Sequence, residues 1–128
     1  MTFNASKIFI FTIRDMLTNT AAFDLSSETH KAALFTDTAT PNQDVTAANS
    51  AYGVGVWATN EQSDTTEWDA GGEPITGTTI DDDDVTGTVE WDATDTPSGG
   101  SSATLTAVFG CLCYAEALAT PVASSVAG

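Results

Sequence analysis

Few side chains in the sequence belong to the types that most often transfer protons or attack a substrate: one His and two Cys stand out. His30 is the only side chain whose ordinary pKa lies near neutral pH. No Ser or Cys motif beside it indicates a nucleophile. His30 follows Glu28 and Thr29 where a loop is expected to become a strand, so we expect a solvated or capping imidazole. The residues thus favour no His-centred catalytic dyad, and we predict no catalytic residue.

Cys111 and Cys113 are separated by one residue within an apolar run. On a strand their side chains would point the same way, and a bridge between them would be strained. We therefore expect two buried free thiols. Together with His30 they supply at most three of the four ligands of a structural zinc site. No phosphate-binding glycine motif occurs either, so we predict no cofactor.

Four consecutive acids, Asp81, Asp82, Asp83 and Asp84, form the densest charge cluster of the chain. Carboxylates bind hard cations such as calcium, and these four residues are the candidate metal ligands. Calcium loops, however, space their ligands at alternate residues and contain a glycine for the turn. We therefore favour a solvated turn over an ion site and predict no metal.

Two matching triplets, Glu67-Trp68-Asp69 and Glu90-Trp91-Asp92, place acids beside tryptophans. Paired carboxylates near aromatic rings occur in glycoside hydrolases. On a strand, however, each Trp would point to one face and its flanking acids to the other. We favour a buried Trp between solvated acids.

The chain is strongly acidic: 18 Asp and Glu oppose 3 Lys and Arg, for a formal net charge of −15 over 128 residues. With only Lys7, Arg14 and Lys31 as cations, binding to nucleic acid or to an anionic membrane is not expected. We favour solubility through charge repulsion as the reason for the acidic composition, and adaptation to high salt stays open as the alternative. No apolar run reaches the roughly 18 residues of a membrane span. The start of the chain lacks the features of a secretory signal, so we expect synthesis in a host cytoplasm.

Short β-type segments alternate with turn signals along the chain. Residues 8–13 fit a strand or the start of a helix, residues 19–24 a turn, and residues 37–43 a loop. Strands are predicted over residues 31–36, 51–57, 74–80, 85–91 and 103–114. In the second of these, Tyr52, Val54 and Val56 would share a face opposite Trp57; in the fourth, Val85, Gly87, Val89 and Trp91 would share one. Residues 81–84 would connect two strands, and the last predicted strand would be central and buried on both sides.

This pattern predicts a mainly β chain: a single antiparallel β-sandwich or small barrel with long loops and an extended N-terminal segment. Residues 1–22 would form an N-terminal arm or edge element. Residues 23–116 would form the core domain. Residues 117–128 would form a flexible C-terminal tail, with a short helical turn near its start.

Several motifs resemble, in the same order, those of a family of small virion proteins from tailed phages of actinobacteria. They begin with FDLSSETHKAALF (23–35) and the Thr-Pro-Asn turn of KAALFTDTATPNQD (31–44). An aromatic-rich patch ending at Asn60-Glu61, AGGEPIT (70–76), VEWDATD (89–95) and ATLTAVFGCLCY (103–114) follow. The resemblance implies a virion structural role, as a head decoration, minor capsid or tail-associated protein, and supplies no catalytic residues. The acidic run 81–84 and the two cysteines depart from the family pattern.

We therefore expect a non-enzymatic capsid decoration or minor capsid protein on the head exterior of a virion. Its partners would be the major capsid protein and copies of itself, with a trimer favoured. The chain termini and residues 37–50 would contact the lattice. A tail or fibre location is one alternative. A carbohydrate-binding β-sandwich module that uses Trp57, Trp68 or Trp91 as a stacking platform is another.

Overall fold

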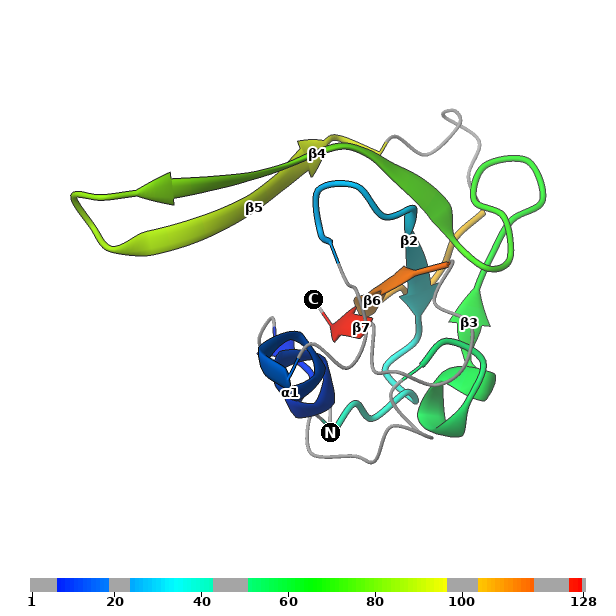
Figure 1. Cartoon of the computed structure of the whole chain (residues 1–128). Coiled ribbons are helices and arrows are strands. Elements are labelled where there is room, and N and C mark those ends of the chain that lie inside the picture. Colours follow the sequence, from blue (N-terminus) through cyan, green and yellow to red (C-terminus); the bar gives the residue numbers. More distant parts are fainter. Residues whose placement is uncertain (1–6, 19–23, 43–50, 97–103, 117–124, 128) are drawn as a thin grey trace.

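The computed structural model describes residues 7–18, 24–42, 51–96, 104–116 and 125–127, and the described chain is mainly β (Figure 1). Its elements are β1 (Lys7–Ile8), α1 (Ile10–Thr18), β2 (His30–Phe35), the 3₁₀ helix η2 (Gly55–Ala58), β3 (Glu61–Gln62), β4 (Glu73–Asp83), β5 (Thr88–Thr94), β6 (Gly110–Ala115) and β7 (Ser125–Ala127). All paired strands are antiparallel. The predicted fold class, mainly β with an antiparallel sheet and long loops, is confirmed, and the sheet is open.

Strand β2 is the centre of the sheet, whose order is β1-β7-β6-β2-β4-β5. One edge of β2 pairs with β6 along its whole length. The other edge pairs with β4 through residues 30–32 and with β3 through residues 34–35. The prediction of a short buried strand at residues 31–36 is therefore confirmed. It is buried because it has a paired strand on each edge and places Ala33 and Phe35 in the core.

The hydrophobic core lies against one face of β2 and β6. Ala33 and Phe35 of β2 are fully buried there, beside Leu112 and Tyr114 of β6. Trp57 of η2 packs edge-on against Phe35, with ring centroids 4.9 Å apart. The core cluster consists of Phe9, Ala33, Phe35, Ala39, Trp57, Leu112 and Tyr114. Aromatic rings therefore supply much of the apolar area that stabilises this small sheet.

Two predicted strands differ from the structure. Residues 51–57 form a turn and η2 instead of a strand, because Gly53 and Gly55 adopt positive φ angles of 78° and 56° that a strand does not accommodate. The predicted strand at residues 103–114 begins only at Gly110 as β6. Ala107, at φ 58°, interrupts the extended conformation before it. From Gly110 on, β6 lies between β7 and β2, as the prediction of a central strand requires.

The acidic run also differs from its prediction, because Asp81, Asp82 and Asp83 belong to strand β4. The turn of the hairpin covers residues 84–87, so Val85 and Gly87 do not share a strand face with Val89. The strand predicted over residues 74–80 is confirmed and extended to residues 73–83. Pro74 lies near its start, the position expected for a proline in a strand.

At the N-terminus, the sequence left strand and helix open for residues 8–13, and the structure contains both. Strand β1 ends at Ile8, and α1 begins at Ile10. β1 is the last strand of the sheet and pairs with β7, which also pairs with β6. The predictions for residues 19–23, 43–50, 97–103 and 117–124 lie outside the described residues.

Candidate functional site

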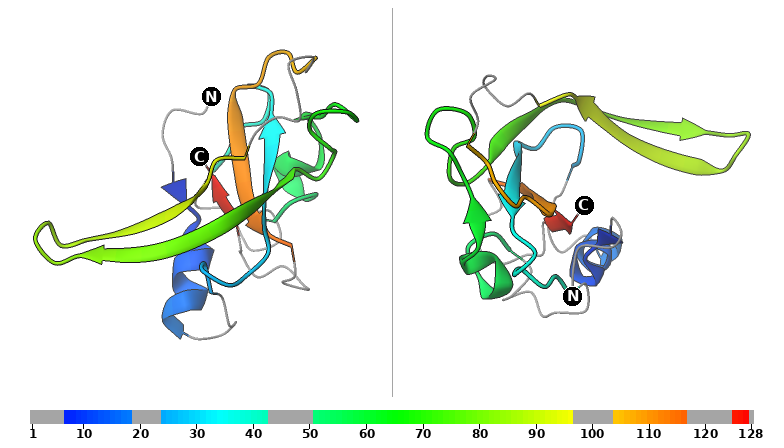
Figure 2. Two further views of the ribbon diagram at one scale, coloured as in Figure 1. Left: turned by 90° about the horizontal axis from the view of Figure 1, so that it is seen from above. Right: turned by 180° about the vertical axis from the view of Figure 1, so that it is seen from behind.

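The hairpin formed by β4 and β5 extends far from the rest of the described chain (Figure 1). Every residue from 81 to 90 is exposed. The other views show the hairpin projecting on the side of the molecule where α1 lies (Figure 2). Since the outer half of the hairpin buries none of the core, its contribution to the fold is small.

A β-bulge sets the direction in which the hairpin leaves the sheet. The register of β4 with β5 shifts between Thr76 and Thr79. Gly77 lies in this bulge at φ 64°, and a Cβ atom there would come within 2.4 Å of the Thr94 hydroxyl oxygen. Bulges bend a strand and increase its twist. The bulge therefore separates an inner part of β4, which pairs with β2, from an outer part that pairs only with β5.

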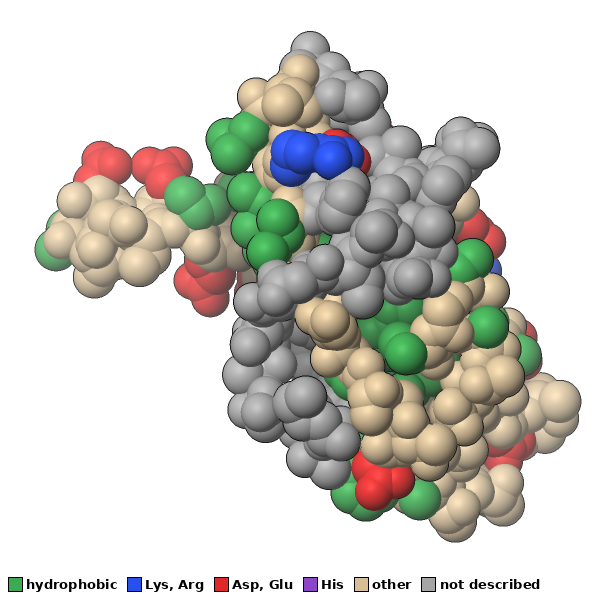
Figure 3. Space-filling model, turned by 90° about the horizontal axis from the view of Figure 1, so that it is seen from below, with side chains coloured by type: hydrophobic (Ala, Val, Ile, Leu, Met, Phe, Trp, Pro, Cys, Tyr) green, Lys and Arg blue, Asp and Glu red, His purple; other side chains and the backbone are tan. Residues whose placement is uncertain are grey.

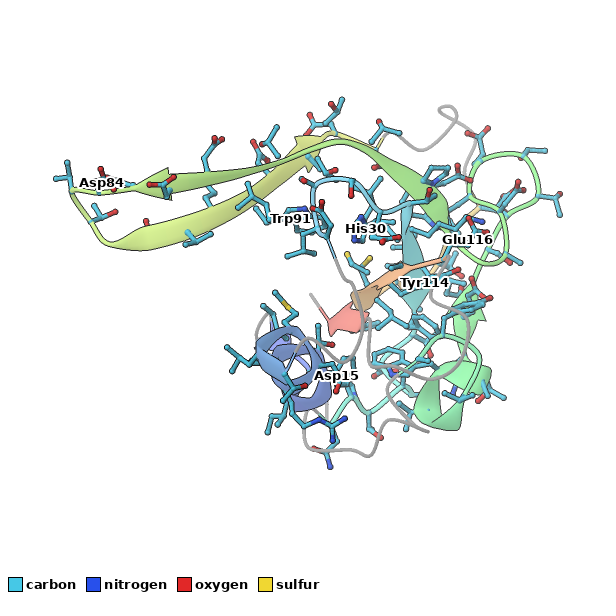
Figure 4. The ribbon with its side chains drawn as sticks, viewed as in Figure 1. Asp15, His30, Asp84, Trp91, Tyr114 and Glu116 are labelled. Carbon is cyan, nitrogen blue, oxygen red and sulfur yellow. The ribbon has the colours of Figure 1, made fainter. Side chains whose placement is uncertain are left out.

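Trp91 anchors the base of the hairpin (Figure 4). Its indole Nε1–H donates a hydrogen bond of 3.0 Å to the Leu25 carbonyl oxygen. Its ring meets the His30 imidazole edge-on, with centroids 5.6 Å apart. The Thr78 hydroxyl also donates to the Ser26 carbonyl oxygen at 3.0 Å. These contacts fix the hairpin base to the loop before β2.

The prediction that His30 is solvated or caps a turn is wrong: the side chain is buried on β2. The polar sequence around it gave no sign that Trp91, 61 residues later, would cover it. Burial lowers the pKa of His30 below its ordinary value, while a hydrogen bond with the Glu28 backbone and the charges of Glu28 and Asp24 partly offset that effect. The His30 imidazole therefore packs, in its neutral form, against the Trp91 indole.

The two faces of the hairpin differ in chemistry because Ile80 lies opposite Trp91 and Asp81 opposite Glu90. The hairpin inner face, on the side of Trp91, consists of Ile80, Asp82, Val89 and Trp91. The hairpin outer face carries the acids Asp81, Asp83, Glu90 and Asp92. The hairpin is therefore an amphipathic ribbon: three of the four inner-face residues are apolar, and the outer face carries four acids.

The acidic tetrad does not converge on one point, because successive residues of a strand alternate between faces. Asp83 is occupied by the turn: its carboxylate accepts hydrogen bonds from the Val85 and Thr86 amides and from the Thr86 hydroxyl. These bonds lower the pKa of Asp83, with the hydroxyl of Thr86 as the largest cause. Within the described ranges, no group of three or more His, Cys, Asp or Glu side chains is arranged to hold a metal ion.

The two acidic Trp triplets lie on separate elements. Glu67 and Asp69 belong to the loop between β3 and β4, whereas Glu90 and Asp92 belong to the projecting hairpin (Figure 1). The structure therefore does not bring the four carboxylates together as a hydrolytic pair. Trp68 is buried and Asp69 exposed, as expected, although Glu67 is half-buried.

The aromatic platforms expected for a carbohydrate module are mostly covered. Trp57 and Trp68 are buried. Trp91 is half-buried and is held by His30 and Leu25. A stacking surface needs an open ring face, so the structure gives no support to a platform built from Trp57 or Trp68.

A tyrosine cluster that sequence reasoning missed lies beside β6. Tyr52 and Tyr114 stack with centroids 4.7 Å apart and planes 6° from parallel. The Glu61 carboxylate accepts bonds of 2.7 Å from the Tyr52 hydroxyl and from the Gly71 amide. Tyr114 donates to the Gly71 carbonyl oxygen at 2.5 Å. These bonds hold the loop between β3 and β4 against the sheet. The sequence gives no sign of this role, because the residues involved lie far apart along the chain.

Both tyrosines are held as proton donors. Burial, followed by the hydrogen bond to Glu61, raises the pKa of Tyr52 above its ordinary value. Burial and the charges of Glu116 and Glu61 raise the pKa of Tyr114 to about 12. A tyrosine with a raised pKa stays protonated at neutral pH and cannot accept a proton. The two hydroxyl groups therefore serve as hydrogen-bond donors that hold the loop between β3 and β4 against the sheet.

Cys111 and Cys113 point to the same side of β6 and are free thiols, as predicted. Their sulfur atoms lie 3.9 Å apart. Both are half-buried, less than expected. The neighbouring Cys113 thiol and burial raise the pKa of Cys111, which keeps this thiol protonated and unreactive at neutral pH.

Helix α1 carries an exposed apolar surface that the sequence analysis did not identify. Ile10, Ile13 and Leu17 are 49%, 43% and 82% exposed. The spacing i, i+3, i+7 places them on one side of the helix. We call these three residues the α1 stripe. No helix within the described parts of the chain is long and apolar enough to cross a bilayer.

Comparison of the chain with protein-family models, curated proteins and solved structures gives no match. The resemblance to small virion proteins therefore stays a prediction.

Proposed function

We propose that the chain is a non-enzymatic virion structural protein, a decoration or minor capsid protein that binds and stabilises the major capsid lattice. The observation that carries the proposal is the projecting β4–β5 hairpin, whose residues 81–90 are all exposed. Ordering each residue of such a ribbon costs conformational entropy, and little core burial compensates for it. We infer that the hairpin serves contact with another molecule.

The chemistry of the hairpin outer face favours a basic protein surface. Asp81 and Glu90 lie directly opposite each other, and like charges in this position are destabilising. A cationic partner would relieve that repulsion and speed association. Two of the three cations of the sequence are already in ion pairs within the chain, Arg14 with Asp15 and Lys31 with Glu116.

A capsid lattice is the partner that the sequence resemblance supports. A protein that binds only the assembled lattice stabilises it by mass action and needs no active site. The packing roles of His30 and of the tyrosine cluster agree with such a protein. Binding would take place on the head exterior, and the hairpin joins residues 37–50, proposed from the sequence, as a candidate contact.

Shortening the hairpin tests the proposal. Since Ile80 and Trp91 are cross-strand partners, replacing residues 81–90 by Asn-Gly closes the hairpin with a two-residue turn and leaves its anchor in place. We expect the shortened protein to fold and to lose binding to capsids that lack the protein, by about tenfold or more in Kd. Co-sedimentation with capsids measures this.

A second variant separates charge from shape. Asp81→Asn, Glu90→Gln and Asp92→Asn together leave the turn bonds of Asp83 intact and remove most of the charge of the outer face. We expect weaker binding that depends less on salt. Undiminished binding by the shortened protein would overturn the role of the hairpin, and a wild-type protein that binds tails instead of capsids would favour the tail alternative.

A further inference from the structure

Among the described side chains of helix α1, two polar ones are buried and the apolar ones are exposed. Asp15 is 4% exposed and points from α1 toward the body of the chain (Figure 4). Thr12 is 2% exposed and, three residues earlier, lies on the same side of the helix. The α1 stripe lies on the opposite side. A surface helix ordinarily has the reverse arrangement. Such an inversion indicates that the outward side of α1 is itself buried in a larger assembly.

The apolar surface continues beyond the stripe. Met16 on α1 and Ile8 of β1 are also exposed, and β1 is the last strand of the described sheet. The space-filling view from below shows hydrophobic side chains gathered on this part of the surface beside a basic side chain (Figure 3). Contiguous exposed apolar patches of this kind typically mark contact sites.

The charge of α1 selects the partner. Its only acid, Asp15, is buried and pairs with Arg14 at 2.6 Å. The outward surface of α1 therefore carries no carboxylate, in a chain with a net charge of −15. Two copies can meet at the α1 stripe without bringing acids together, whereas most other contacts between copies would oppose carboxylates.

The hairpin inner face enlarges the contact area. A helix of nine residues is only about 13 Å long and cannot by itself bury the roughly 800 Å² per partner of a stable interface. The hairpin projects on the side of α1 (Figure 2), and Ile80 and Val89 of its inner face are exposed. The one acid of that face, Asp82, lies opposite Val89.

We propose that the α1 stripe and the hairpin inner face form the interface between two copies of this chain. The inference deepens the proposed function and rests on it for the setting in a virion. The inner face of the hairpin would contact another copy of the chain, and the outer face would contact the capsid lattice. The contact is between like surfaces, as in a closed symmetric oligomer.

Sedimentation-velocity measurements of the isolated full chain, across a concentration series and without capsids, test the interface. We expect a concentration-dependent oligomer for the wild type and, for Leu17→Glu, a Kd of self-association raised by about tenfold or more. Because Leu17 is 82% exposed, the variant should keep the wild-type circular dichroism spectrum and, at concentrations where both proteins are monomeric, the wild-type Tm.

Val108→Glu is the matched control, because Val108 is exposed. The segment before β6 to which it belongs lies away from α1 (Figure 1). This variant should oligomerise like the wild type. A monomeric wild type, or an oligomer that survives Leu17→Glu or dissociates equally with Val108→Glu, overturns the inference. Since no capsid is present, none of these results bears on binding to the lattice.

Discussion

His30 lies beneath the indole of Trp91 and is kept neutral by burial, which lowers its pKa from the ordinary 6.5. In the unfolded chain the imidazole takes up a proton at a higher pH than in the folded chain. The unfolded state therefore binds more protons between the two pKa values, and stability falls as the pH drops below about 6.5.

Replacing His30 by Gln should remove this dependence. The free energy of unfolding, measured by urea denaturation at about pH 7.5 and pH 5.5, should fall on acidification in the wild type and change less in His30→Gln. Carboxylates with lowered pKa values, such as Asp24 at about 2, lose their contribution only at lower pH. Equal pH slopes in the two proteins would contradict the assigned role of His30.

Gly72 is the residue where the backbone leaves no room for a side chain. Its φ is 81°, and a Cβ would lie 2.3 Å from the Ala32 carbonyl oxygen of β2. Gly53, at φ 78°, has no atom within 4 Å of the same position. We expect Gly53→Ala to cost about 1 kcal/mol through backbone strain, and Gly72→Ala to cost a further ~1–3 kcal/mol through overlap. Chemical denaturation of both variants measures the difference, and equal losses would show that the contact with β2 is unimportant.

At the scale of elements, the outer half of the hairpin is held by its turn and cross-strand pairs alone. Asp81 faces Glu90 across the strands, whereas Asp82 faces Val89. Asp81→Lys should therefore convert a repulsive pair into an attractive one and stabilise the hairpin by about 0.2–1 kcal/mol. Hydrogen exchange of the β4 and β5 amides reports this directly.

Asp82→Lys is the matched control, since it changes the net charge equally and gains no cross-strand acid. It should protect the amides less than Asp81→Lys does. Identical protection in both variants would mean that total charge, and not the pair, governs the hairpin.

The sequence predicts a helix or strand correctly where the apolar residues of that element face the core. The strand at residues 31–36 fits that rule, because its small and aromatic residues face the core. Helix α1 does not, because Thr12 and Asp15 are buried while Leu17 is exposed. The apolar pattern of residues 8–13 therefore left its type open. The length of the hairpin was missed for a related reason: strand patterns assume one buried face, and residues 81–90 have none.

At the scale of the whole molecule, the mainly β class followed from the spacing of turn signals, but the placement of surfaces did not. The bulge at Gly77 and the contact between Trp91 and His30 join residues far apart in the sequence. No local pattern predicts such contacts. The resulting molecule has a small aromatic core, an acidic ribbon and an apolar helix surface, a distribution suited to assembly.

Copy number in the virion tests the central claim of an assembly protein on the capsid lattice most directly. Quantitative mass spectrometry of purified particles, with the major capsid protein as the internal standard, gives the ratio of the two chains. The account predicts a fixed ratio on the order of one copy per lattice site, maintained in tailless heads. A handful of copies per particle, or loss of the protein together with the tails, would contradict it.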